Sequence, residues 1–175
     1  MKKHSLLFLI LLSIVMTTQA QSPEQKLQQL GITLPVPAKP VATYVNAVRT
    51  GNLIYLSGKG PTNADGTDIT GKLGKDLSIE QGYAAAKSTG INLLAALKAE
   101  IGSLDKVKRI VKVLGMVNCV PGFEHHPFII NGCSELFAEV WGTDNGIGVR
   151  SAVGMGSLPN NISVEIEVIF ELHEV

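Results

Sequence analysis

The sequence predicts an α+β domain of order ββαβαββ, with two long helices packed on one face of a mixed sheet. Residues 162–173 alternate between apolar and mostly polar side chains, as expected for a strand with one buried face. Two earlier stretches instead repeat apolar residues at helical spacing. About 155 residues follow the N-terminal apolar segment, which suits one domain with a substantial core. Helices collected on one side of such a sheet define the α+β class.

A hairpin is expected to open the domain. Residues 44–48 and 53–56 are rich in strand-forming side chains, and Arg49-Thr50-Gly51-Asn52 between them predicts the turn. The preceding residues 21–40 contain four prolines. We therefore expect a leader there rather than a core element, in which only residues 24–30 are free to form a helix.

Each long helix has a start or stop signal. Ser78-Ile79-Glu80-Gln81 is a capping box that opens the first helix, and Gly102 ends it. The second helix is expected over residues 128–141, with Gly142 as its end. The inward stripes are Tyr83, Ala86, Gly90, Leu93, Leu94, Leu97 and Ile101 in the first helix, and Ile129, Cys133, Leu136, Phe137 and Val140 in the second.

Three strands complete the pattern. A long strand over residues 107–120 is expected to place Val107, Val111, Val113 and Val117 on one side. Two more, over 149–155 and 162–173, are joined around Leu158-Pro159-Asn160-Asn161. The last strand should direct one set of residues to the core, namely Val164, Ile166, Val168, Phe170 and Leu172.

The N-terminus is typical of a signal peptide. Lys2 and Lys3 precede an apolar core of residues 6–16, and Thr18-Gln19-Ala20 supplies small residues for cleavage after Ala20. A membrane anchor is the alternative, but the core is shorter than the roughly 18 to 20 residues that span a bilayer. We expect an exported chain, periplasmic or secreted and free of the membrane, divided into a signal peptide (1–20), a leader (21–40) and a domain (41–175).

Composition limits the partners. Removing residues 1–20 leaves 13 basic and 15 acidic residues, a net charge of −2, which offers no electrostatic footprint for nucleic acid. Cys119 and Cys133 are too few for a disulfide scaffold, although one bridge or two buried thiols are both open. A sheet face carrying Gly154, Gly156 and Ile169 is too poor in charge to lie in water, so we expect a homo-oligomer.

An ordered set of short elements resembles the Rid/YjgF imine deaminases. These elements span residues 40–172 and are Tyr44, Leu56-Ser57-Gly58 with Pro61, Asn131, Val149-Arg150-Ser151, Leu158-Pro159 and Val164-Glu165-Ile166-Glu167. The resemblance implies a chorismate-mutase-like fold, a homotrimer and ligand clefts between subunits. It also implies hydrolysis of 2-imino acids to 2-oxo acids and ammonia, without a cofactor.

The resemblance assigns roles that the chemistry supports. Arg150 matches the carboxylate-binding arginine, because a guanidinium offers a planar carboxylate two parallel hydrogen bonds. Glu165 matches the general base that orients water against the imine carbon. The remaining matches are expected to line the cleft or its edge: Tyr44, Ser57, Gly58, Asn131 and Ser151. Without the resemblance, an ordinary ion pair of Arg150 with Glu165 or Glu167 is the simpler interpretation.

The chain also departs from the family pattern. Ala152 stands where the deaminases usually have cysteine, and Gly148 where they usually have proline. The connection over residues 121–127 differs as well, and brings His125 and His126 near the mouth of the expected cleft. Adjacent histidines diverge and lack further ligands at suitable spacing, so we expect a polar loop rather than a metal site.

The sequence is compatible with two classes of function. The first is an imine or enamine deaminase that acts on a 2-imino acid. The second is a non-catalytic trimer that binds small carboxylates, such as 2-oxo acids, through Arg150. Ribonuclease activity is the weakest hypothesis, because an acidic chain is poorly suited to a polyanion.

Overall fold

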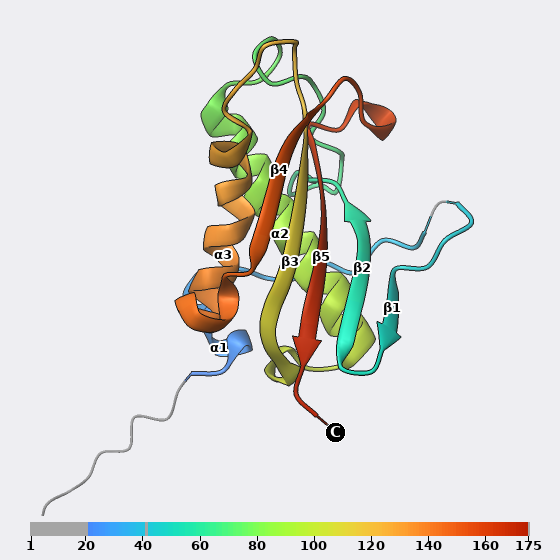
Figure 1. Cartoon of the computed structure of the whole chain (residues 1–175), viewed down its shortest axis with the longest axis vertical. Coiled ribbons are helices and arrows are strands. Elements are labelled where there is room, and N and C mark those ends of the chain that lie inside the picture. The colour runs from blue at the N-terminus through green and yellow to red at the C-terminus, as the bar shows by residue number, and fades with distance from the viewer. Residues whose placement is uncertain (1–20, 41, 175) are drawn as a thin grey trace, which may run out of the picture.

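The computed structural model describes residues 21–40 and 42–174, so the expected signal peptide lies outside the described residues. Figure 1 shows the elements, with α2 and α3 packed together across one face of the sheet. In chain order they are α1 (Pro23–Gln29), β1 (Ala47–Thr50), β2 (Leu53–Lys59), α2 (Ile79–Ile101), the 3-10 turn η1 (Leu104–Lys106), β3 (Val107–Asn118), α3 (His126–Gly146), β4 (Val149–Met155), the 3-10 turn η2 (Pro159–Asn161) and β5 (Val164–Leu172).

The sheet is mixed, as predicted. Its strand order is β1-β2-β5-β3-β4, and only the β3–β4 pair is parallel. The α3 helix makes the crossover that a parallel pair needs. The α+β class and the order ββαβαββ are therefore confirmed, with β1 and β4 at the two edges.

Alternation in β5 is confirmed in full. This strand lies between β2 and β3, so one of its faces packs on the helices and the other faces away from them. The five core residues predicted for it are all buried: Val164, Ile166, Val168, Phe170 and Leu172. Both long helices pack against this face.

The helix signals are confirmed as well. Ser78 and the side chain of Gln81 cap each other at the start of α2, with bonds of 3.2 and 2.8 Å. Gly102 ends α2 with a φ of 86°. In α3, Gly142 has a φ of 77° and breaks the helix where predicted, after which one short turn continues to Gly146. The predicted inward stripe of α3 is buried.

Some details of the predicted core are wrong. Two register irregularities in β3 turn Ile110, rather than Val111, into the core, so Ile110 is buried and Val111 only half-buried. Tyr83 is also only half-buried, because its hydroxyl reaches out to Glu135. The leader is not separate from the core either: α1 forms within it and buries Leu27.

The face of the sheet turned away from the helices is called the open face below. On this face lie Val48, Tyr55, Arg109, Lys112, Leu114, Met116, Val149, Ser151, Val153, Glu165, Glu167, Ile169 and Glu171. The expectation that Gly154 and Gly156 belong to it is wrong. Gly154 is in register with the buried Val117 and faces the helices, while Gly156 follows the end of β4.

Cys119 and Cys133 are free and buried. The structure therefore has two buried thiols rather than a disulfide bridge. Within the described residues, no helix is both long enough and apolar enough to cross a membrane.

Candidate functional site

Arg150 is held by α3. It lies on the edge strand β4 in register with the buried Val113, which directs its side chain to the helix-covered side. Its Nη1 donates to Asn131 Oδ1 at 2.8 Å and to Ser134 Oγ at 3.1 Å. Asn131 and Ser134 are three residues apart on α3, so one helix turn presents both oxygens to the same nitrogen.

These contacts leave part of the guanidinium free. A third bond runs from Nη2 to the carbonyl oxygen of Pro127 at 3.3 Å. An arginine has five N–H donors, so among the described residues one donor on Nε and one on Nη2 stay unused. Arg150 is exposed. Its partners are neutral, so its full charge is available to an anion.

A pocket of about 360 Å³ adjoins Arg150, between α3 and β4. Its wall is largely apolar and includes Val113, Ala138 and Ile147, while Glu135 is its acidic member. This combination suits a small ligand that has a carboxylate at one end and an apolar part at the other.

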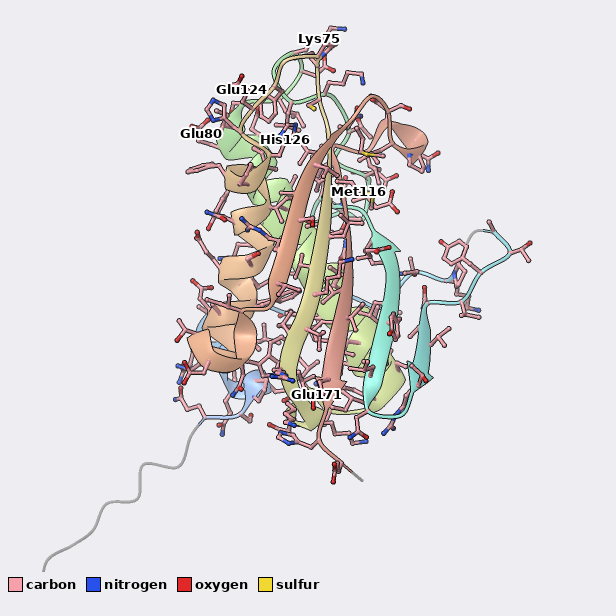
Figure 2. All side chains as sticks on the ribbon, viewed as in Figure 1. Lys75, Glu80, Met116, Glu124, His126 and Glu171 are labelled. Atoms are coloured by element: carbon pink, nitrogen blue, oxygen red, sulfur yellow. The ribbon has the colours of Figure 1, made fainter. Side chains whose placement is uncertain are left out.

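Glu165 lies on the other face of the sheet. It is in register with Met116, which Figure 2 labels on the open face. Its carboxylate lies against Gly58, where a Cβ atom would overlap Oε1. Burial, followed by the charge of Glu167, raises the pKa of Glu165. A carboxylate with a raised pKa is a stronger proton acceptor once ionised.

Lys59 orders the polar groups next to Gly58. Its ammonium donates to Asn46 Oδ1 at 2.6 Å and to Ser57 Oγ at 3.2 Å, and Asn46 in turn donates to Ala38 O at 3.2 Å. Because an ammonium only donates, Ser57 Oγ must accept here and its own hydrogen is free to point elsewhere. Burial lowers the pKa of Lys59.

The predicted site residues therefore form two groups within one chain. Arg150 and Asn131 come together beside α3, while Ser57, Gly58 and Glu165 come together where β2 meets β5. Two further predicted residues join neither group. Tyr44 is half exposed and precedes the opposite edge strand, β1, and Ser151 is exposed on the open face of β4.

The simpler interpretation of Arg150 is wrong within the described residues. Its partners are neutral oxygens, and it forms no ion pair with Glu165 or Glu167 there. The register explains this, because Glu165 and Glu167 lie on the face opposite to Arg150. The described residues also contain no group of three or more side chains suited to hold a metal ion.

Two site residues were not predicted. Ser134 follows Asn131 by three residues in the expected helix, and that spacing was a usable signal. Lys59 directly follows the Ser57-Gly58 pair, but nothing in its spacing indicates that its side chain returns to Ser57. The β-bulge between Leu56 and Lys59 turns it there.

Comparison with known proteins places this geometry in a family. Residues 24–170 match the family model described as "YjgF/chorismate_mutase-like, putative endoribonuclease". The chain belongs to the YjgF/chorismate-mutase-like family. The match includes every predicted site residue, and the order of elements agrees with the fold that the resemblance implies.

Relatives in this family carry different names. Protein TCP17 of Trypanosoma cruzi is 39% identical over 147 residues, which cover 84% of this chain and 92% of the relative. A 2-iminobutanoate/2-iminopropanoate deaminase of Dermatophagoides farinae is 30% identical over 139 residues, covering 79% and 92%. The crystal structure of the protein Atu1372 of Agrobacterium tumefaciens, whose function is unknown, is 41% identical with a TM-score of 0.79, covering 86% and 92%. A named deaminase thus stands among the relatives.

Proposed function

We propose that the chain hydrolyses small 2-imino acids to 2-oxo acids and ammonia. The observation that carries this proposal is the pair of unused N–H donors on Arg150, which neutral contacts from α3 hold in place. A carboxylate is the ligand that such a fork recognises best. The deaminase among the relatives supports this choice of substrate.

In the proposed reaction, Arg150 binds the carboxylate of the imino acid and Glu165 orients a water molecule. The water oxygen attacks the carbon of the protonated imine, the C=N π electrons neutralise its nitrogen, and Glu165 takes a proton from the water. The resulting carbinolamine then loses its amine: Glu165 returns the proton to nitrogen, the C–N bond breaks and ammonia leaves. As the C–N bond breaks, the hydroxyl oxygen forms the C=O bond, and Glu165 takes the hydroxyl proton to give the 2-oxo acid.

One chain alone does not bring these groups together, because Arg150 and Glu165 lie on opposite faces of its sheet. We therefore propose that the site forms between subunits of a homotrimer, with Arg150 from one chain and Glu165 from the next. The open face supports this assembly, since Val149 is 70% exposed, Val48 56% and Tyr55 41%. These side chains lie on one sheet face, between its edge strands β1 and β4, and exposed apolar side chains on such a face support a subunit interface.

Complementation between subunits tests both parts of the proposal. Arg150→Ala and Glu165→Gln are each expected to abolish hydrolysis of 2-iminopropanoate, measured with an amino-acid oxidase as the imine source and semicarbazide as a competing trap. In trimers that mix the two variants, a site is intact where Arg150 of a Glu165→Gln chain meets Glu165 of an Arg150→Ala chain. In an equal mixture this holds for roughly a quarter of all sites. A site built within one chain gives no recovery.

The binding protein for small carboxylates remains the second candidate, because Arg150 and its pocket are complete within one chain. Calorimetry with pyruvate separates the two. The binder takes up pyruvate yet leaves the semicarbazide trap unaffected, and Glu165→Gln changes neither result. The deaminase competes with the trap and loses that competition in Glu165→Gln.

We also propose that the chain is exported, from its signal-like first 20 residues. N-terminal sequencing of secreted protein is expected to begin at Gln21. A start at Met1 contradicts export with cleavage.

A further inference from the structure

A cysteine and a histidine meet outside the site described above. Cys119 follows the end of β3, where its backbone N–H donates to Met155 O at 3.2 Å. His126 is the first residue of α3, and Figure 2 labels it near the start of that helix. Cys119 Sγ and His126 Nε2 are 3.4 Å apart, within hydrogen-bonding reach for sulfur. The thiol and the imidazole are therefore placed to form a hydrogen bond, whose direction depends on which ring nitrogen of His126 carries the hydrogen.

The surroundings hold this pair in place. The ring of Phe123 stacks edge-to-face on His126, with centroids 5.3 Å apart. On β4, the exposed Gly154 lies directly against the pair: a Cβ atom there would overlap His126 Nε2 and come within 3.0 Å of Cys119 Sγ. His126 thus occupies the space that the side chain of any other residue at this position would need.

We infer that Cys119 and His126 form a reactive thiol–imidazole pair, in which Cys119 is a site of modification by small electrophiles such as hydrogen peroxide. This inference does not depend on the proposed deaminase. His126 takes the thiol proton, and the thiolate is the nucleophile.

The reaction with peroxide balances without a metal or cofactor. The thiolate sulfur attacks one peroxide oxygen, an S–O bond forms and the O–O bond breaks, so sulfur is oxidised to a sulfenic acid while peroxide is reduced. The second oxygen leaves as hydroxide. His126 returns the proton that it took from the thiol, and the hydroxide becomes water. A carbon electrophile such as iodoacetamide reacts at the same sulfur, with iodide as the leaving group.

Cys133 serves as a control within the same molecule. Its side chain is fully buried, Cys119 is 7% exposed, and burial raises the pKa of the Cys133 thiol. The folded chain is treated with iodoacetamide, and separately with peroxide plus dimedone, and each cysteine is followed by peptide mass spectrometry. We expect Cys119 to react at least about tenfold faster than Cys133. Equal rates in the wild type overturn the inference.

Two variants separate the effect of the His126 imidazole on the reactivity of Cys119 from the effect of the exposure of Cys119 to solvent. His126→Gln removes the proton acceptor and is expected to slow modification of Cys119 by about tenfold or more. His125→Gln is the matched control, because His125 also stacks on Phe123, at 5.8 Å, but its ring has no contact with sulfur among the described residues. It should leave the rate within about twofold of the wild type.

Cys133 reports unfolding, because this buried thiol reacts rapidly only if a variant has unfolded. If His126→Gln opens the chain, Gly154→Ala takes its place, since its methyl group displaces His126 from Cys119 and should slow the same reaction. A folded His126→Gln or Gly154→Ala chain whose Cys119 reacts as fast as the wild type overturns the inference.

Discussion

Replacing Arg150 with lysine keeps the positive charge and removes the planar fork. In the wild type, Nε and one Nη2 hydrogen remain for a ligand carboxylate. A lysine ammonium has three N–H donors, and contacts with Asn131 and Ser134 would occupy two of them. The variant therefore loses at least one charge-assisted hydrogen bond to the ligand, about 1.5 to 3 kcal/mol. That loss corresponds to a Kd for pyruvate raised roughly 10- to 150-fold.

Isothermal titration calorimetry with pyruvate measures this change. Arg109→Lys is the matched control, because Arg109 is exposed on β3 and donates to Glu171 on the open face, on the other side of the sheet from the α3 pocket. It should leave the Kd unchanged. Folding should survive both substitutions, since the contacts of Arg150 lie at an exposed position. If Arg150→Lys binds pyruvate as tightly as the wild type, Arg150 does not hold the carboxylate.

Three further predictions concern the other half of the site and the assembly. Hydrolysis should fall as the pH is lowered through the raised pKa of Glu165, because only the ionised form accepts a proton; an activity that rises over that range is incompatible with a base at this position. Lys59→Met should slow hydrolysis roughly fivefold, which is the effect of losing about one hydrogen bond; unchanged kinetics would show that Lys59 takes no part in the site. Light scattering at micromolar concentration should give the mass of a trimer, and a monomer mass contradicts the shared site.

The pH dependence of stability has a defined sign at Glu165. Burial raises its pKa, so the fold favours the protonated carboxyl over the ionised one. The contribution of Glu165 to stability is therefore fully present below the ordinary pKa of glutamate and is lost as the pH rises through the raised value. Glu165→Gln removes this decline, and urea titrations at several pH values report it.

Periodicity predicted the fold because one dominant force determines it. The alternation of β5 and the stripe of α3 both record which side chains leave water, and burial is the largest favourable term in folding. Where a local irregularity intervenes, the same pattern fails. The two shifts in β3 replaced Val111 by Ile110 in the core, and no feature of that valine-rich run indicates where a shift falls.

The site could be predicted only in part. The resemblance supplied Arg150 and Asn131, and the structure brings them together at 2.8 Å. It also supplied Glu165, but the side of the sheet on which a residue lies depends on strand order and register. Those depend on pairing between distant segments, such as Val113 with Arg150 and Met116 with Glu165. The sequence therefore indicated which residues belong to the candidate site, but not that they lie on two opposite faces of the sheet.

Gly58 joins the fold to the chemistry proposed for the open face. The carboxylate of Glu165 occupies the space where any other residue at this position would place its Cβ atom. The same close approach helps to remove the carboxylate from water, and burial is the first cause of its raised pKa. One missing side chain therefore sets both the position and the protonation of Glu165. Arg150 needs no such burial, because a guanidinium stays charged whatever surrounds it, and the fold can leave it exposed at the edge strand to meet a ligand.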